Sequence, residues 1–334
     1  MKKSISLILT IAVLTSVLTI SGCSQPSETV SWKLAAYRAP THVITQEWDV
    51  FAEKINERTN GKLQITVFPG GSLLDRQAQF TGVVDNIAEL SSTVGAYHGG
   101  QVPLVGAQDL PFSYSTYGGA LDTIRGGLGE LQAAEYVSFG LAPLIFFPAG
   151  RIDIFTNFPV KTPADLAGKL IRGAGGMQLS FMEKCGASPV AMPSGDVYMA
   201  MQTGTIDGFF ITDTTFVANR LYEVTDYATL VPIMIPLSVI LMNSASYDAL
   251  PSKIQKILYE TAEESADALV GIVETGDLAA QDKMRSEGMT VTQLSAAEVA
   301  PFKELGMLTW DEFVQKNPDT SAPQMLEIIK KYAK

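Results

Sequence analysis

Apolar residues recur along the chain at the spacings that are typical of strands and helices, and the two kinds of element alternate. Residues 30–36 are expected to form a strand. The helix predicted next has an apolar stripe that recurs every three or four residues from Ile44 to Ile55, with Thr41 as its expected N-cap. Residues 62–68 alternate between apolar and polar positions, as in a half-buried strand. Strand, helix and strand in this order predict an α/β unit.

The same order returns between residues 150 and 230. Thr162-Pro163-Ala164-Asp165 offers an N-cap threonine, an N1 proline and a carboxylate at the start of a short helix. Short strands are expected at residues 169–172, 188–192 and 206–211, with helices between them. This part of the chain is therefore predicted to be a second α/β region.

Two later segments are expected to join these regions. Residues 231–242 are apolar and contain two prolines, which favours a β-type segment that crosses between two lobes. A helical pattern begins at Ser252, with Gln255 as its expected capping-box partner, and continues toward Gly288, about 50 Å at 1.5 Å per residue. The alternative, an isolated coiled coil, is disfavoured because the stripe has no sustained leucine seam. We therefore expect one long helix braced across two lobes.

The N-terminus has the layout of an export signal. Two lysines precede an almost wholly apolar run that ends at Ile20, and small residues and Cys23 follow. A membrane-spanning helix needs about 20 apolar residues, so this run is short for one. Because Ser-Gly-Cys follows this run, the whole N-terminal segment resembles a bacterial lipoprotein signal. Residues 1–22 are then a signal peptide, Cys23 is the lipidation site and residues 23–30 are a tether. The alternative is an uncleaved anchor.

In either case, the domain is expected to be exported and held at a membrane, in a periplasm or on the outer face of the cytoplasmic membrane.

Composition and motifs exclude several classes of function. Acidic residues outnumber basic ones by 35 to 24, for a net charge of −11, which argues against nucleic-acid or anionic-membrane surfaces. Two cysteines and two histidines exclude a disulfide scaffold and most metal centres, so we expect neither a metal nor a cofactor. P-loop, HExxH and GxSxG motifs are absent, and no complete GxGxxG is present. The sequence thus contains no catalytic constellation.

Arg172 is the residue with the clearest binding potential. It ends a predicted strand and precedes a glycine-rich turn, residues 173–176, that opens a helix. In open α/β sheets, ligands bind beyond the carboxyl ends of the strands. A guanidinium beside the N–H groups of a helix start can bind a carboxylate with two hydrogen bonds. On spacing alone, a structural salt bridge is an equal alternative for this residue.

Three stretches in this region carry a family resemblance. They read TPADLAGKLIR at residues 162–172, GASPVAMP at 186–193 and QTGTIDG at 202–208, and Leu110-Pro111-Phe112 agrees with them. On these motifs the chain resembles the substrate-binding proteins of tripartite ATP-independent periplasmic (TRAP) transporters, the DctP family. The resemblance covers nearly all of the chain after the signal.

The resemblance implies an α/β, two-lobed periplasmic-binding-protein-like fold, with crossing strands and a long helix that spans both lobes. Residues 31–148 plus about 237–275 would form lobe I, and residues 149–236 plus about 276–334 would form lobe II. Such proteins capture a small organic acid by closing their lobes, without catalysis, and deliver it to TRAP permease subunits in the membrane.

The resemblance also implies roles for particular residues. The family arginine that pairs with the ligand carboxylate falls on Arg172, and a second family arginine has Arg151 as its nearest candidate. Ile211 stands where many relatives carry an asparagine, and Ser194 where many carry an aromatic residue. One pocket wall should therefore be less polar and another wider. We expect a monocarboxylate with an apolar or aromatic body.

Several alternatives remain open at this stage. The ligand could instead be held through Thr212 or Asp213. Four residues of first-lobe loops could face the cleft, or could equally be packing residues, namely Thr93, Tyr97, Tyr37 and His42. The alternatives to a transport protein are a sensory binding protein for the same ligands and an uncharacterised surface-anchored enzyme.

Overall fold

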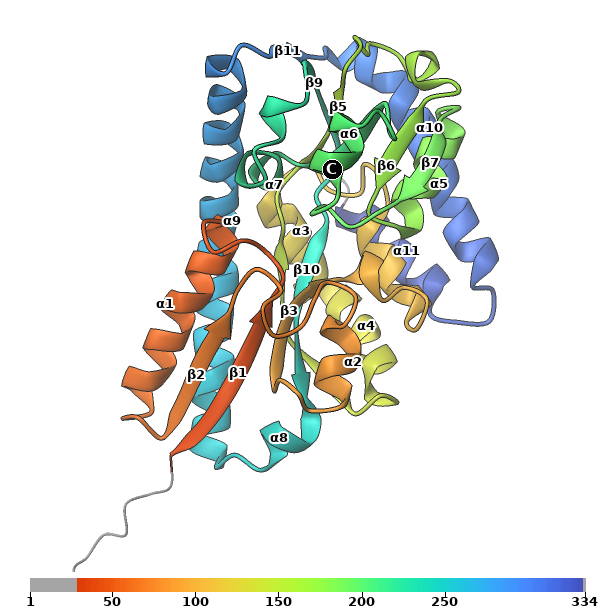
Figure 1. Cartoon of the computed structure of the whole chain (residues 1–334). Helices are drawn as coiled ribbons and strands as arrows, with labels where there is room; N and C mark the ends of the chain where they lie inside the picture. Colours follow the sequence, from red (N-terminus) through yellow and green to blue (C-terminus); the bar gives the residue numbers. More distant parts are fainter. Residues whose placement is uncertain (1–28, 333–334) are drawn as a thin grey trace, which may run out of the picture.

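Two β-sheets, one in each lobe, organise the computed structural model, which describes residues 29–332 (Figure 1). The first sheet has the order β2-β1-β3-β10-β4, in which β1 is parallel to both of its neighbours and β10 is antiparallel to both of its own. Its strands are β1 (Val30–Ala36), β2 (Leu63–Phe68), β3 (Leu90–Val94), β4 (Leu141–Pro148) and β10 (Leu237–Asn243).

The second sheet has the order β11-β9-β5-β8-β6-β7. Its strands are β5 (Ile152–Thr156), β6 (Leu170–Gly173), β7 (Ser188–Ala191), β8 (Gly208–Thr212), β9 (Tyr227–Met234) and β11 (Thr290–Gln293). The chain passes from one sheet to the other between β4 and β5, and returns between β9 and β10. The crossing segment predicted at residues 231–242 is confirmed, and it supplies one strand to each sheet.

Helices cover both sheets, and their apolar faces supply the cores. Those before the second sheet are α1 (Val43–Arg58), α2 (Gln79–Val84), α3 (Tyr117–Thr123) and α4 (Gly129–Val137). The later ones are α5 (Gly176–Lys184), α6 (Val197–Gln202), α7 (Asp213–Ala218), α8 (Ser244–Asp248), α9 (Ser252–Ser286), α10 (Ala296–Lys316) and α11 (Ala322–Tyr332).

Helix α1 buries the predicted stripe from Ile44 to Ile55 against the first sheet and α9. The prediction of Thr41 as its N-cap is wrong. His42 takes that position, because its Nδ1 accepts a hydrogen bond from the N–H of Ile44 at 3.2 Å. A histidine ring nitrogen here does the work that a hydroxyl oxygen usually does at a helix start.

The 35 residues of α9 run along the side of both lobes (Figure 1). Leu258 and Leu269 belong to the core of the first lobe, whereas Ala280 and Met284 join the core beneath the second sheet. The predicted long helix is therefore confirmed, but its predicted capping box is not. The N-cap is Pro251, and the side chain of Gln255 donates to the carbonyl oxygen of Tyr247 at 2.9 Å instead.

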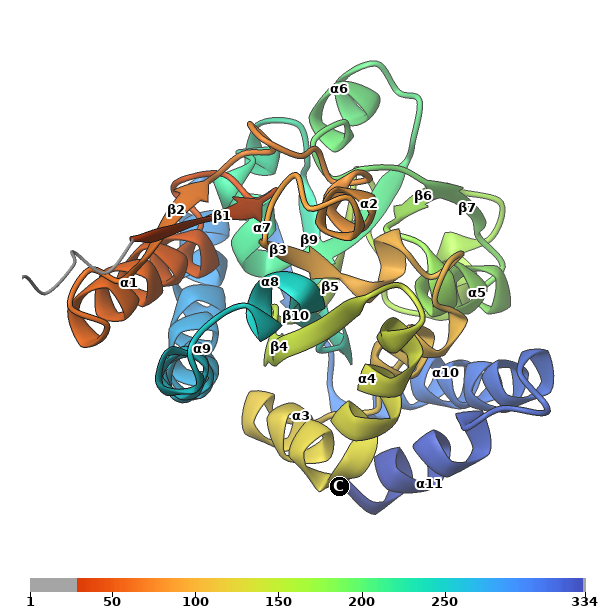
Figure 2. The same ribbon diagram turned by 90° about the horizontal axis from the view of Figure 1, so that it is seen from below.

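The C-terminal helices are shared between the lobes, which departs from the predicted assignment of residues 276–334 to lobe II. Phe302 of α10 lies in the core of the second lobe, but Phe313, later in the same helix, packs in a core of the first lobe. Met325 and Ile329 of α11 belong to that first-lobe core too, and α11 lies beside α3 (Figure 2). The rest of the predicted division remains a prediction.

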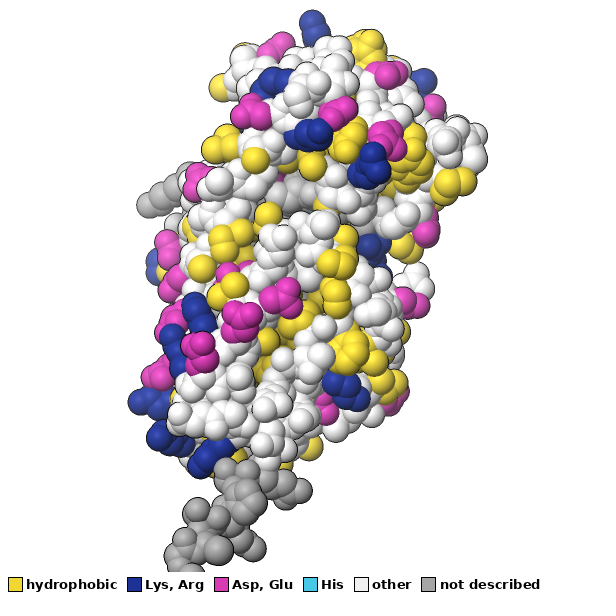
Figure 3. All heavy atoms as spheres, turned by 60° about the vertical axis from the view of Figure 1, so that its left-hand side comes forward, with side chains coloured by type: hydrophobic (Ala, Val, Ile, Leu, Met, Phe, Trp, Pro, Cys, Tyr) yellow, Lys and Arg dark blue, Asp and Glu magenta, His cyan; other side chains and the backbone are white. Residues whose placement is uncertain are grey.

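Charged side chains of both signs lie intermixed with apolar ones on the face shown in Figure 3. Within residues 29–332, no helix is long and apolar enough to cross a membrane. The predicted signal peptide and the lipidation site Cys23 lie outside the described residues, as does most of the tether.

Two leucines of α9 provide a matched test of its bracing role. Leu258 is fully buried in the first-lobe core, whereas Leu278 is 61% exposed. Leu258→Ala should lower the free energy of unfolding by about 2–5 kcal/mol, because it leaves a cavity in a packed core. Leu278→Ala should change it by about 0.5 kcal/mol or less. Urea unfolding of both variants measures the difference, and equal effects would contradict the packing described.

Candidate ligand-binding site

A pocket lies between the two lobes, where parallel strands of both sheets end. It encloses about 600 Å³ of space, part of it open to solvent. Its polar lining comes largely from residues at or just after strand ends, as expected for ligand sites in α/β folds. The polar residues include Tyr37, Arg38, Tyr97, Asp109, Arg172 and Gln178, and the apolar ones include Val94, Ala149, Ile152, Ile211 and Met234.

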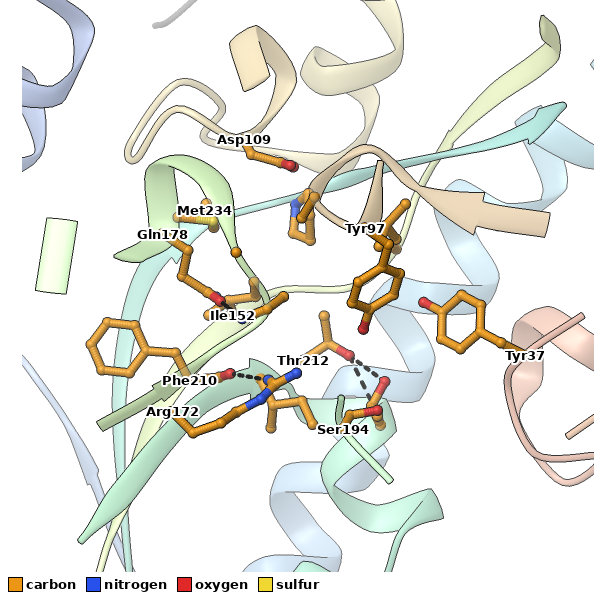
Figure 4. A pocket seen from close by; sticks show the side chains of 18 of the residues that line it. Tyr37, Tyr97, Asp109, Ile152, Arg172, Gln178, Ser194, Phe210, Thr212 and Met234 are labelled. Carbon is orange, nitrogen blue, oxygen red and sulfur yellow. Dashed lines mark hydrogen bonds between the residues drawn. The ribbon is translucent and has the colours of Figure 1, made fainter. Parts of the chain in front are cut away.

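Arg172 is buried at the floor of this pocket and 1% exposed (Figure 4). Its Nε donates to the carbonyl oxygen of Met192 at 2.8 Å, and its Nη1 donates to that of Phe210 at 3.0 Å. Its Nη2 is buried and has no hydrogen-bond partner within the described part of the chain. Backbone carbonyls therefore hold this guanidinium in place, and the salt bridge considered from the sequence is not formed with any described carboxylate.

Burial is the main influence on the charge of Arg172. It lowers the pKa of the guanidinium from its ordinary value, and the phenol of Tyr97 partly offsets that effect. The guanidinium still remains charged at any pH a protein meets. A buried cation with an open N–H donor is a strong site for an anion, because a carboxylate can accept the hydrogen bond and neutralise the charge.

Arg151 has a different environment and does not line the pocket. Its Nε donates to Oδ2 of Asp153 at 2.9 Å, and its Nη2 lies 3.6 Å from Oδ2 of Asp213. Its backbone N–H donates to Oδ2 of Asp277 on α9 at 2.7 Å. Burial raises the pKa of Asp153 to about 6 and that of Asp277 to about 7. Arg151 thus ties the β4–β5 crossing to α7 and α9.

Five other predicted site residues line the pocket together with Arg172: Tyr37, Tyr97, Ser194, Ile211 and Thr212. Ile211 lies on β8 and adds to the apolar wall. The hydroxyl of Thr212 is engaged in capping α7, where it pairs with the hydroxyl of Thr215 at 2.7 Å. These residues shape the wall, and the phenol of Tyr97 interacts with the guanidinium of Arg172, which is the charged donor among them.

The remaining predictions fall outside the pocket. Asp213 is fully buried and accepts from Nε2 of Gln281 at 2.8 Å, in the cluster around Arg151. Thr93 is fully buried in β3, and its neighbour Val94 lines the pocket instead. His42 caps α1, and its Nε2 lies 3.3 Å from the hydroxyl of Thr215 on the other lobe.

Sequence reasoning missed Arg38, Asp109 and Gln178. The sequence did contain a signal for Arg38, because this residue closely follows β1. Ligand sites in α/β folds lie at the carboxyl ends of parallel strands. Asp109 ends a 3-10 helix that starts at Pro103, and nothing in the local sequence marks it. The amide of Gln178 is engaged in accepting a hydrogen bond from the N–H of Ala174 at 2.5 Å.

Aromatic and cationic side chains stack along the first-lobe side. Tyr37 and Tyr97 meet edge to face, with ring centroids 5.6 Å apart. The guanidinium carbons of Arg38 and Arg76 lie 4.6 and 4.7 Å from the Tyr37 ring centroid. Burial raises the pKa of Tyr37 to about 12. The lining thus has two guanidinium groups against one carboxylate, Asp109, which suits an anionic ligand.

No group of three or more histidine, cysteine, aspartate or glutamate side chains within residues 29–332 could hold a metal ion.

Asp109 predicts a pH dependence of stability. Burial raises its pKa from the usual 3.8 to about 7, so the folded state holds a proton that the unfolded chain releases near pH 4. Stability should therefore fall as pH rises from about 4 through 7. Asp109→Asn, neutral throughout, should be more stable than the wild type above pH 7 by up to about 4 kcal/mol.

Unfolding free energies measured from pH 4 to 8 test this expectation. Asp319→Asn, at an exposed loop position, is the control and should follow the wild-type profile. Parallel profiles for the wild type and Asp109→Asn would contradict the assignment of a buried proton to Asp109.

Comparison with known proteins places this geometry in a family. A family model described as bacterial extracellular solute-binding protein, family 7 (DctP), matches residues 34–317. The 2,3-diketo-L-gulonate-binding periplasmic protein YiaO of Escherichia coli K12 is 27% identical over 80% of this chain and 82% of its own length. The C4-dicarboxylate-binding periplasmic protein DctP of Rhodobacter capsulatus is 26% identical over 80% and 81%, respectively.

Solved structures share the fold. A TRAP periplasmic solute-binding protein from Desulfovibrio salexigens with bound orotic acid has a TM-score of 0.86 and 24% identity, over 91% of this chain and 99% of that one. The pyroglutamate-binding extracytoplasmic solute receptor DctP7 of Bordetella pertussis has a TM-score of 0.84 and 21% identity, over 90% and 100%. With its two lobes, crossing strands and interlobe pocket, this chain belongs to the DctP family of bacterial extracellular solute-binding proteins, the receptors of TRAP transporters.

Proposed function

We propose that this protein captures a small monocarboxylate with an apolar or aromatic body and delivers it to a TRAP permease. The observation that carries the proposal is Arg172, which is buried in the interlobe pocket with Nη2 unpartnered. A buried charge is costly unless it is paired, and a ligand carboxylate is the partner that the pocket lacks.

The walls support the proposed ligand class. Ile152, Ile211 and Met234 are buried apolar residues that line the pocket around the space next to Arg172. A charged contact at Arg172 beside these apolar walls suits a ligand that is polar at one end and apolar along the part of its body that meets the walls. The relatives named above support an acid in general, because diketogulonate, C4-dicarboxylates, orotate and pyroglutamate all carry carboxylates.

Closure of the two lobes over the ligand is the proposed mechanism. Loops from opposite lobes approach closely, since a Cβ on Gly175 would lie 2.9 Å from the carbonyl oxygen of Ala96. With φ of +149° and this contact, only glycine suits the position. Excluding water on closure strengthens the ion pair between Arg172 and a carboxylate, because the local dielectric falls.

The proposed function also includes export of the protein and its attachment to a membrane. The N-terminal segment reads as a lipoprotein signal, so Cys23 would carry lipid and anchor the binding protein to a membrane beside its permease. The tether that follows would leave the two lobes free to capture ligand and dock on the permease.

Arg172→Ala tests the carboxylate assignment. Thermal unfolding is measured with pyroglutamate, orotate, glucuronate, succinate and hexanoate. A ligand at 100 times its Kd adds about 2.7 kcal/mol, and each kcal/mol raises Tm by about 2–4 °C. Arg172→Ala should weaken binding of the best acid several hundred-fold, since breaking a buried ion pair costs about 3–5 kcal/mol. Binding within tenfold of the wild type would refute the assignment.

Arg151→Ala is the matched control. It leaves Asp153 and Asp213 without their cation, so it should lower the unfolding temperature while acid affinity stays within about tenfold of the wild type. The reverse pattern, with affinity lost in Arg151→Ala and kept in Arg172→Ala, would assign the carboxylate to Arg151.

A further inference from the structure

A second arginine, Arg38, lines the same pocket with open hydrogen-bond donors. It is 6% exposed, and its Nη2 donates to the hydroxyl of Ser238 on β10 at 2.9 Å. Its guanidinium also lies over the ring of Tyr37. Its Nε and Nη1 are buried and have no partner within residues 29–332. The side chain is therefore fixed in position with two of its nitrogens unused.

Arg38 and Arg172 approach the pocket from opposite lobes. Arg38 follows β1 in the first lobe, and Arg172 belongs to β6 in the second. Arg38 is anchored to Ser238 of the first sheet, whereas Arg172 is anchored to the carbonyl oxygens of Met192 and Phe210 in the second lobe. A ligand held between the lobes can therefore contact one guanidinium group from each side.

The open donors of Arg38 call for an acceptor. Contact with the face of Tyr37 offsets part of the cost of burying the cation, but it gives Nε and Nη1 no hydrogen bond. Asp109 is the one carboxylate in the lining, and it forms no ion pair with Arg38. A buried N–H left without an acceptor costs free energy that a bound oxygen would recover.

We propose that Arg38 determines ligand specificity by binding a second oxygen acceptor, distant from the carboxylate. The ligand is then an acid that carries a hydroxyl, carbonyl or second carboxylate at the far end of an apolar body. This inference rests on the proposed function, in which Arg172 binds the first carboxylate. A hydroxyl or carbonyl acceptor keeps the ligand a monocarboxylate, whereas a second carboxylate would make it a dicarboxylate.

A purely structural role for Arg38 makes a different prediction. If Arg38 served only to join β1 to β10 through Ser238, its loss would lower stability and affect all acids alike. A specificity role instead changes the ratio between acids that differ only at the far end. The experiment therefore measures the ratio of affinities between acids that differ only at the far end, as well as the affinity for each acid.

Isothermal titration calorimetry of the purified protein uses three acids at each chain length from four to six carbons. They are the saturated monocarboxylate, the ω-hydroxy acid and the dicarboxylate. At one or more lengths, the wild type should bind an acceptor-bearing acid about tenfold or more tighter than the saturated acid, as expected for a hydrogen bond to a charged group. The better of the two analogues identifies the acceptor as neutral or anionic.

Arg38→Met should reduce this preference to about threefold or less, while the affinity for the saturated acid changes little. Arg38→Lys is the second variant, because it keeps the charge without the guanidinium fork and should retain a preference only for the dicarboxylate. Arg76→Met is the control, since Arg76 stacks on the same Tyr37 ring but does not line the pocket, and it should keep the full preference.

Two outcomes would overturn the inference alone: a wild type that binds the saturated acid as tightly as its analogues, or an Arg38→Met variant that keeps the wild-type preference. In both cases the proposed function stands if Arg172→Ala still abolishes acid binding. A wild type that binds none of the acids in either panel would overturn the proposed function and this inference together.

Discussion

The burial of a guanidinium between two lobes is the constraint on which this structure depends. Arg172 is 1% exposed and charged, so the fold must hold it without neutralising it. Two backbone carbonyls do so, from the residue after β7 and from β8, and they leave Nη2 open to the pocket. A carboxylate in their place would have formed a closed salt bridge and removed the affinity for an anionic ligand. Arg172 thus keeps a hydrogen-bond donor available for the carboxylate of a ligand.

The unpartnered donor of Arg172 can meet a ligand between the lobes only if the scaffold holds the two lobes in a defined arrangement. Two crossings of the chain, helix α9 and the C-terminal helices connect the lobes. The cluster of Arg151 with three buried aspartates fastens the first crossing to α9. Arg151 has carboxylate partners although its Nη2 forms no hydrogen bond, whereas neither Arg172 nor Arg38 is paired with a carboxylate of residues 29–332. The molecule therefore separates its charges into a paired group that holds the junction together and an unpaired group that faces the pocket.

Much of the fold was predictable from local patterns. The stripe of α1, the alternation in β2 and the long periodic run of α9 are properties of neighbouring residues, so their spacing alone predicts them. The predictions of helix N-caps were wrong where a different residue occupies the N-cap position. His42 caps α1 in place of Thr41, and Pro251 precedes α9 where a capping box was expected. The path of α11 onto the first lobe was also missed, because no local pattern says which of two apolar surfaces a terminal helix covers.

By itself, the sequence determined the α/β elements, the family motifs and Arg172 as a carboxylate-binding candidate, since each depends on residues close together in the chain. Only the tertiary structure decided which charges pair. Arg151 meets Asp213 and Asp277 across 60 residues or more, whereas Arg38 meets Ser238 across 200 and keeps two donors free. The physical reason is that a salt bridge or an open donor depends on distance and burial in three dimensions, and the periodicity of a sequence carries no record of either.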